Sequence, residues 1–118
     1  MAARVLIVDD HESFRRLATR VLAASGFIVI GEAVDAASAI RQTASLRPDV
    51  VLLDVMLPDR SGLEVARELA AEPGAPRVVL TSSRSRSDFG TGLQWPGCEF
   101  IPKHLLSGPS LAALLSDR

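Results

Sequence analysis

The chain has 118 residues, 47% of them hydrophobic, and a formal net charge of −1. This length and composition fit one globular domain with a buried core, and the charge balance excludes a global basic field for nucleic acid. No apolar run approaches the roughly 20 residues of a membrane-spanning helix, and the N-terminus does not resemble a secretory signal. The single cysteine, Cys98, fits a reducing compartment. We therefore expect one cytoplasmic domain over residues 1–118, with no output domain and no membrane contact.

Short apolar runs alternate with longer amphipathic segments along the chain. Residues 5–8 (VLIV) are typical of a strand buried on both faces of a parallel sheet. The next apolar residues recur at helical spacing, and Gly26 ends the pattern. They are Phe14, Leu17, Ala18, Val21 and Leu22. Residues 27–31 predict a second strand, and Asp35 is placed to cap a helix over residues 36–46.

The same unit recurs in the second half of the chain. Residues 50–53 predict a third strand that leads into Asp54. Ser61 followed by Glu64 indicates a capping box for a third helix. The inner face of that helix would carry Leu63, Ala66, Leu69 and Ala70. Residues 77–80 predict a fourth strand that ends at Thr81.

The pattern weakens beyond the fourth strand. Residues 82–92 hold many hydroxyl and glycine positions, so the expected fourth helix is short or irregular. Residues 99–101 predict a fifth strand, and Pro109 starts a final helix. This alternation predicts an α/β fold, a doubly wound five-stranded parallel sheet with helices on both faces.

Polar residues follow four of the predicted strands. Asp9 and Asp10 follow the first, Asp54 the third, Thr81 the fourth and Lys103 the fifth. Ligands in such sheets bind outside the carboxyl ends of the strands, and carboxylates that converge there need a cation. Oxygen ligands favour Mg²⁺, beside which a carboxylate can attack a phosphoryl group. The sequence therefore predicts a magnesium site and an aspartyl phosphate, with Lys103 and Thr81 neutralising phosphoryl oxygens.

Four motifs carry a resemblance to a known family: VLIVDD (5–10), DVMLPDRSGLEV (54–65), LTSS (80–83) and FIPK (100–103). Over essentially its whole length the chain resembles the response-regulator receiver domains of bacterial two-component signalling. The resemblance implies a flavodoxin-like sheet of strand order 2-1-3-4-5. It implies that Asp54 is the phosphoacceptor and that Mg²⁺ binds Asp9, Asp10, Asp54 and the backbone carbonyl of Met56. It also implies that Thr81 and Lys103 contact the phosphoryl oxygens, and that Thr81 and Phe100 form the switch.

The resemblance also implies partners. The phosphoryl group would come from a sensor histidine kinase or a phosphotransfer protein, in a transfer that the receiver itself catalyses. The surface of the fourth helix, fifth strand and fifth helix would carry the result to a downstream output protein or domain. A phosphorylation-dependent homodimer is compatible with this scheme, whereas direct nucleic-acid binding by this domain is not expected.

Two regions depart from the family pattern. The family commonly has a proline after the lysine, joined by a cis peptide, whereas Pro102 precedes Lys103 and His104 follows it. Residues 83–97 lack the features of a regular helix, and Trp95 stands where small residues are usual. The geometry of the output surface is therefore the least transferable part of the resemblance.

Each of these residues also has a plainer interpretation. Asp9 and Asp10 could cap the first helix, and Phe100 could serve only in the core. His11, beside the acidic pair, is expected to face solvent rather than to bind metal. The arginines at positions 84 and 86 fit a solvated loop better than a partner patch.

Two other functions remain open. One is a degenerate receiver that acts as a protein-binding scaffold without phosphate, for which the irregular fourth helix and the missing Lys-Pro pair argue. The other is a magnesium-dependent phosphatase with Asp9 as nucleophile. Such enzymes place a second acid two residues further on and need a cap domain, for which 118 residues leave no space.

Overall fold

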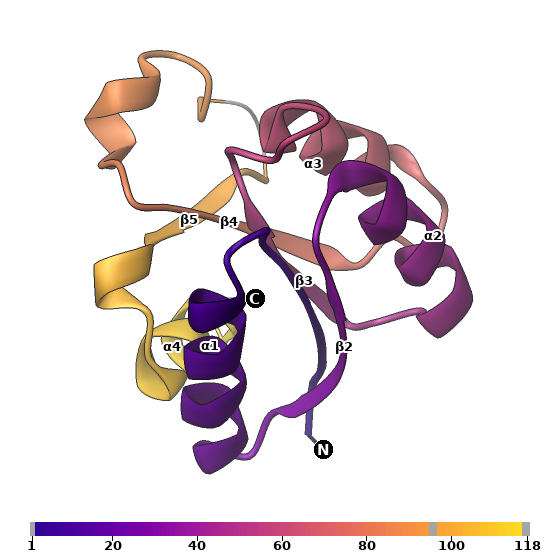
Figure 1. The fold of residues 1–118 in the computed structure, drawn as a ribbon, viewed down its shortest axis with the longest axis vertical. Coiled ribbons are helices and arrows are strands. Elements are labelled where there is room, and N and C mark those ends of the chain that lie inside the picture. The colour runs from indigo at the N-terminus through magenta and orange to yellow at the C-terminus, as the bar shows by residue number, and fades with distance from the viewer. Residues whose placement is uncertain (1, 95–96, 117–118) are drawn as a thin grey trace.

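The computed structural model describes residues 2–94 and 97–116, so Trp95 lies outside the described residues. Five parallel strands form one sheet in the order β2-β1-β3-β4-β5, which confirms the predicted fold class (Figure 1). The strands are β1 (Arg4–Val8), β2 (Ile28–Ala33), β3 (Val50–Asp54), β4 (Arg77–Ser82) and β5 (Glu99–Pro102). The α-helices are α1 (Glu12–Ala24), α2 (Ala36–Leu46), α3 (Gly62–Ala71) and α4 (Gly108–Leu115). Two short 3-10 helices, η1 (Arg86–Phe89) and η2 (Lys103–Leu105), flank β5.

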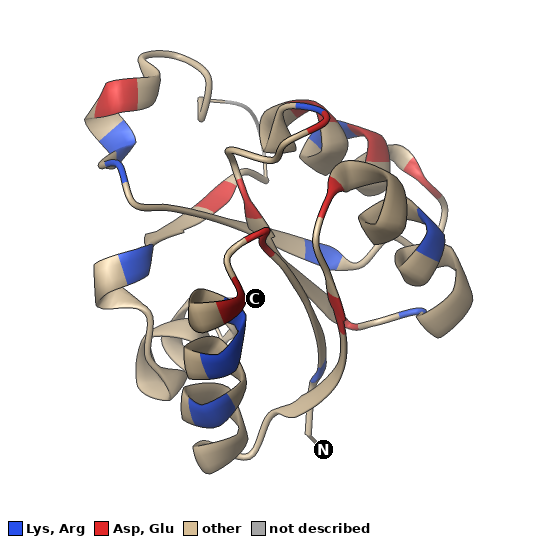
Figure 2. Cartoon of the chain, viewed as in Figure 1, with Lys and Arg blue, Asp and Glu red and all other residues tan. Residues whose placement is uncertain are grey.

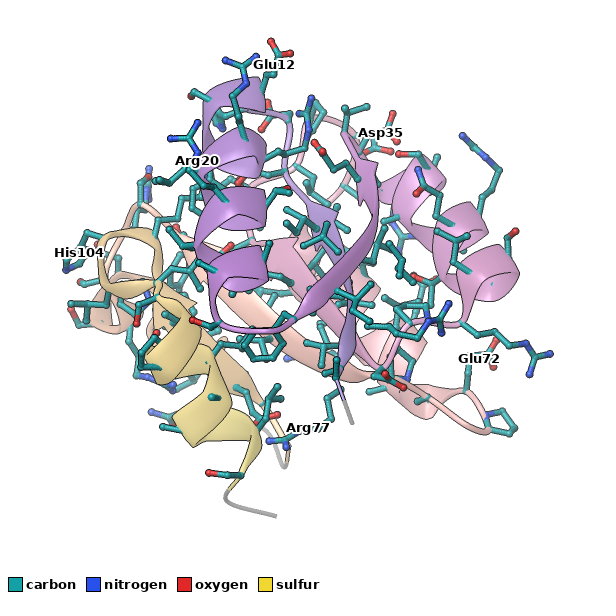
Figure 3. All side chains as sticks on the ribbon, turned by 90° about the horizontal axis from the view of Figure 1, so that it is seen from below. Glu12, Arg20, Asp35, Glu72, Arg77 and His104 are labelled. Atoms are coloured by element: carbon teal, nitrogen blue, oxygen red, sulfur yellow. The ribbon has the colours of Figure 1, made fainter. Side chains whose placement is uncertain are left out.

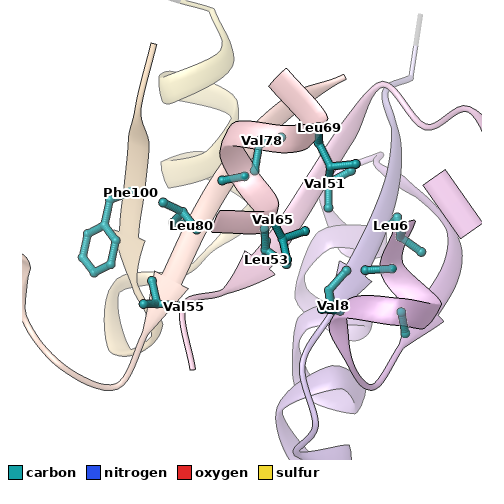
Figure 4. Close-up of a cluster of buried hydrophobic side chains, with 14 of the residues drawn as sticks. Leu6, Val8, Val51, Leu53, Val55, Val65, Leu69, Val78, Leu80 and Phe100 are labelled. Atoms are coloured by element: carbon teal, nitrogen blue, oxygen red, sulfur yellow. The ribbon is translucent and has the colours of Figure 1, made fainter. Parts of the chain in front are cut away.

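Alternate residues of the central strands supply two separate cores. In β1, Leu6 and Val8 belong to the core under α2 and α3, shown in Figure 4. Val5 and Ile7 belong to the core under α1 and α4. Because side chains alternate across a strand, a continuous apolar run is what a doubly covered sheet requires.

Strand β2 is longer than predicted. The expected strand over residues 27–31 stopped at Gly31, but Glu32 and Ala33 continue the pairing, opposite Ile7 and Val8. A Cβ atom at Gly31 would lie 2.9 Å from Gln42 Oε1 and 3.0 Å from a methyl carbon of Leu46. Gly31 therefore lets α2 pack closely on the strand, and does not end it.

The helix starts confirm one predicted cap and correct a predicted capping box. Asp35 accepts a hydrogen bond from the Ser38 amide at 2.8 Å and forms the cap of α2, whose bounds match the prediction. Ser61 caps α3 by accepting from the Leu63 amide, but the predicted reciprocal bond from Glu64 does not form. Glu64 lies beside the Arg60 guanidinium instead.

The inner face of α3 also differs from the prediction at one position. Ala70 is exposed, and Val65 is fully buried in its place. Leu69 and Ala66 are buried as expected. Residues 65, 66 and 69 lie on one side of the helix and form a narrow apolar face that packs on the sheet.

The C-terminal helix α4 is tied to the amino end of the sheet. Its cap is Ser107, and Pro109 lies in its first turn. Arg77, the first residue of β4, donates to the carbonyls of Leu114 and Leu115 and pairs with Glu99 (Figure 3). These bonds satisfy carbonyls that the last turn of a helix leaves free.

The predicted fourth helix is irregular, as expected. Between β4 and β5 the described residues form only the single 3-10 helix η1, turns and bends. None of the helices in the described part of the chain combines the length and apolar character needed to cross a membrane.

Candidate functional site at the carboxyl edge of the sheet

The carboxyl ends of β1, β3 and β5 bring three charged side chains together. Lys103 Nζ lies 2.6 Å from Asp9 Oδ2 and 3.2 Å from Asp54 Oδ2. The Asp9 and Asp54 side chains are 0% and 3% exposed, and that of Lys103 is 15% exposed. Figure 2 shows acidic segments meeting where β1 and β3 end. Two buried carboxylates thus share one ammonium group, as the sequence predicts.

Asp54 is the last residue of β3 and is held at both oxygens. Its Oδ1 accepts the Met56 amide at 3.0 Å, and its Oδ2 faces Lys103. Burial, together with the negative charge of Asp9, raises the pKa of Asp54 above its usual range. The Met56 amide and Lys103 oppose that rise without cancelling it. The Asp54 carboxylate is therefore short of positive charge, which an additional cation would supply.

Lys103 reaches the acids although it lacks a following proline. The described peptide bonds are all trans, and Lys103 opens the turn η2. Burial alone would lower its pKa, but Asp9 and Asp54 outweigh this and raise the pKa above its usual value. Its ammonium also lies 4.6 Å from the centre of the Phe14 ring. The ion pairs and the ring hold the charged form of Lys103 in place.

Asp10 and His11 lie at the exposed side of the site. Asp10 is 37% exposed, and its Oδ1 is 3.2 Å from His11 Nδ1. Nδ1 also lies 2.9 Å from Asp9 Oδ1, so the expectation that His11 simply faces solvent is incomplete. His11 takes the N-cap position of α1 and has no side-chain cap bond, so the acids do not cap this helix.

Four side chains form a possible metal-binding group. One ligand atom from each of Asp9, Asp10, His11 and Asp54 lies within 4.8 Å of the others. Carboxylate oxygens suit Mg²⁺, and the buried charge of the first and last of these acids is only partly matched by one lysine. The residues present therefore fit a divalent cation.

Thr81 lies beside Asp54 and has an unused hydroxyl. The two residues are directly paired in the β3–β4 register, and Thr81 is 1% exposed. Its Oγ1 is buried without a hydrogen-bond partner among the described residues. A buried hydroxyl without a partner is costly, so this atom is suited to an oxygen ligand that arrives at Asp54.

The loop after Asp54 is shaped by close backbone contacts. A Cβ atom at Gly62 would lie 2.1 Å from the Asp54 carbonyl oxygen, so only glycine fits there. Met56 pairs with Ser61 across the loop in an isolated antiparallel bridge. The loop therefore has a fixed course around the residue whose carbonyl the resemblance assigns to the metal.

Asp59 fastens this loop to α2. Its carboxylate accepts hydrogen bonds from the amides of Ala36 at 2.8 Å and Ala37 at 3.0 Å. These bonds lower the pKa of Asp59, the Ala36 bond having the largest effect. The sequence did not reveal this contact, because the partners are 23 and 22 residues apart.

Phe100 is buried in this conformation. It is 7% exposed, and its ring meets the Phe89 ring edge-on with the centroids 5.9 Å apart. The Arg86 guanidinium lies 5.5 Å from the centre of the Phe100 ring. The expectation that Arg86 belongs to a solvated loop is therefore incomplete, because its guanidinium covers the aromatic ring of the predicted switch.

Comparison with known proteins agrees with this geometry. The family described as "Response regulator receiver domain" matches residues 5–114. DNA-binding response regulator MtrA of Mycobacterium tuberculosis is 42% identical over 105 residues, which cover 87% of this chain and 45% of MtrA. A protein-glutamate methylesterase/protein-glutamine glutaminase of Hahella chejuensis is 41% identical over 90 residues, covering 76% of this chain and 26% of that protein. The chain thus spans less than half the length of these relatives.

A solved structure matches the whole fold. The signal receiver domain of the putative response regulator NarL from Mycobacterium tuberculosis superimposes with a TM-score of 0.83 at 32% identity. The match covers 98% of this chain and 95% of that structure.

Proposed function

Since the chain belongs to the response regulator receiver domains of bacterial two-component systems, we propose that Asp54 accepts a phosphoryl group in a Mg²⁺-dependent reaction. The observation that carries this proposal is the buried Asp54 carboxylate, held at 3.2 Å from Lys103 and within 4.8 Å of further ligand atoms. Its raised pKa, caused first by burial, shows that the Asp54 carboxylate would gain from an added cation.

The chemistry is a phosphoryl transfer from a phosphohistidine. A carboxylate oxygen of Asp54 bonds to phosphorus while the bond from phosphorus to the histidine nitrogen breaks. The electron pair of that bond stays on the nitrogen, and because the other ring nitrogen carries a proton, the histidine leaves as neutral imidazole. Mg²⁺, held by Asp9, Asp10, Asp54 and the Met56 carbonyl, would neutralise charge on the phosphoryl oxygens. No other metal chemistry is needed.

Lys103 and Thr81 have separate tasks in this scheme. Once Asp54 becomes an acyl phosphate, the negative charge lies on the phosphoryl oxygens rather than on the carboxylate. The Lys103 ammonium would then pair with a phosphoryl oxygen. The unpartnered Thr81 hydroxyl donates to a second oxygen. Movement of Thr81 toward the phosphoryl group opens space toward β5, where Phe100 is buried. Phosphorylation would thereby alter the surface of η1, β5 and α4.

The partners follow from this chemistry. We expect a sensor histidine kinase or a phosphotransfer protein as donor and an output protein or domain as recipient of the signal. A phosphorylation-dependent homodimer would use the same surface. The DNA binding named for MtrA belongs to that longer protein, and we expect no direct nucleic-acid binding by residues 1–118.

The test is direct modification. Wild-type protein is incubated with acetyl phosphate and Mg²⁺ and analysed by intact-mass and peptide mass spectrometry. We expect one phosphoryl adduct, mapped to Asp54, that is absent in Asp54→Ala and without Mg²⁺. Asp49→Asn, at the opposite end of β3, is the matched control and should label normally. An unmodified wild-type protein would refute the proposal.

One observation favours a second candidate, a scaffold that binds partners without phosphate. The segment between β4 and β5 has only one 3-10 turn, so the usual helical output surface is lacking among the described residues. The affinity of a partner isolated with the wild-type protein distinguishes the scaffold from the phosphoacceptor. Equal affinity for wild-type protein and Asp54→Ala, with and without beryllofluoride, would support the scaffold.

A further inference from the structure

His11 adds a nitrogen donor to a group of carboxylates. Its Nδ1 is 2.9 Å from Asp9 Oδ1 and 3.2 Å from Asp10 Oδ1. Adjacent ligands at right angles around an ion with bonds of about 2.1 Å lie about 3 Å apart. Nδ1 thus lies at hydrogen-bond distance from Asp9 Oδ1, and both spacings also equal those of neighbouring ligands on one metal ion.

The two oxygens of Asp9 face different charges. Oδ2 lies 2.6 Å from the Lys103 ammonium, whereas Oδ1 faces His11. The lysine thus takes one side of the carboxylate, and Oδ1 on the other side meets the His11 backbone amide at 2.8 Å and the His11 ring. The His11 side chain is 64% exposed, so its ring can meet an ion that arrives from solvent.

We propose that His11 Nδ1 is a direct ligand of the divalent cation bound by Asp9, Asp10 and Asp54, and that it shifts the preference of this site from Mg²⁺ toward later first-row ions such as Co²⁺. The inference rests on the metal-binding part of the proposed function. Neutral imidazole suits borderline-soft ions that follow the Irving–Williams order, whereas Mg²⁺ favours oxygen and retains its waters. Metal binding would replace the hydrogen bond from Nδ1 to Asp9, so that the ring carries its proton on Nε2 and offers the Nδ1 lone pair to the ion.

The experiment compares Co²⁺ and Mg²⁺ on the untagged protein. Binding is measured by titration calorimetry for wild-type protein, His11→Ala, His11→Asn and His104→Ala. His104 is the matched control, because it is the only other histidine of the chain and lies on the outer side of η2 (Figure 3). We expect His11→Ala to weaken Co²⁺ binding at least about tenfold, and Mg²⁺ binding less than about threefold. His11→Asn should behave like His11→Ala toward Co²⁺, and His104→Ala like wild type.

A spectroscopic readout identifies the ligand itself. The Co²⁺ form of the wild type should show strongly shifted proton resonances from one histidine ring, retained in His104→Ala and absent in His11→Ala. Shifted resonances in none of these proteins, or an equal loss of Co²⁺ and Mg²⁺ affinity in His11→Ala, would overturn the proposal. Circular dichroism verifies that each variant is folded.

The outcome is separable from that of the proposed function. If histidine resonances shift in the wild type but Asp54 is never modified by acetyl phosphate, the metal ligand stands and the phosphoacceptor assignment fails. If Asp54 is modified in Mg²⁺ and no histidine resonance shifts, the phosphoacceptor stands and the role of His11 is refuted.

Discussion

Replacing Lys103 with methionine tests how the buried charges of the site are balanced. Methionine keeps an unbranched chain against Phe14 but removes the ammonium that lies 2.6 Å from Asp9 and 3.2 Å from Asp54. At an effective dielectric constant of about 20, these two contacts contribute about 6 and about 5 kcal/mol of gross attraction. Desolvation of the ammonium offsets much of this sum. Removing one partner of a buried ion pair typically costs about 3–5 kcal/mol, the loss expected here in metal-free buffer.

The assay is urea unfolding at pH 7 in the presence of a chelator, followed by far-ultraviolet circular dichroism. The same substitution is then made with Asp54→Asn, which removes one of the two carboxylates. The loss caused by Lys103→Met should fall by at least half in that background, and excess Mg²⁺ should likewise restore the single variant. A Lys103→Met protein within about 1 kcal/mol of wild type, or an equal loss in both backgrounds, would refute a shared buried charge.

Further variants probe the neighbouring features. Phe100→Ala should lower the free energy of unfolding by about 3–5 kcal/mol in denaturant titrations, because a buried ring and its contact with Phe89 are lost. Gly62→Ala should displace the Asp54 backbone and weaken Mg²⁺ binding in calorimetry, since its Cβ would lie 2.1 Å from the Asp54 carbonyl oxygen. The lowered pKa of Asp59 means that its contribution to stability is full above its unfolded pKa near 3.8 and is lost as pH falls through the lower folded value. Asp59→Asn should therefore make stability fall less steeply with pH in the acid range. An unchanged acid range would contradict the bonds from the Ala36 and Ala37 amides to Asp59.

Most of the fold follows from local patterns. Apolar runs and cap residues predicted the five strands and the bounds of α2, because burial on both faces of a sheet and helix capping each depend on a few neighbouring residues. The extent of β2 was wrong because Gly31 is governed by α2, which packs against it. The Ser61 box was half right, because Arg60 competes for Glu64.

The candidate site divides in the same way. Asp9, Asp54 and Lys103 could be brought together from the sequence, since the carboxyl ends of parallel strands meet at one edge. The bond from Asp59 to α2 and the position of Arg86 over Phe100 could not, because each depends on how separate loops fold back. Such contacts leave no periodic signal in the chain.

The bonds of Arg77 fasten the amino ends of β4 and β5. Arg77 and Glu99 are the first residues of β4 and β5, and their ion pair, with the carbonyls of Leu114 and Leu115, binds both strands to the last turn of α4. Thr81 stands near the opposite end of β4. A displacement that starts there should therefore pivot the two strands about the Arg77 anchor. Because the first turn of α4 is held against α1 at Gly108, the carboxyl ends of β4 and β5 and the turn η2 would move furthest, and a partner that binds there would meet the largest change in surface.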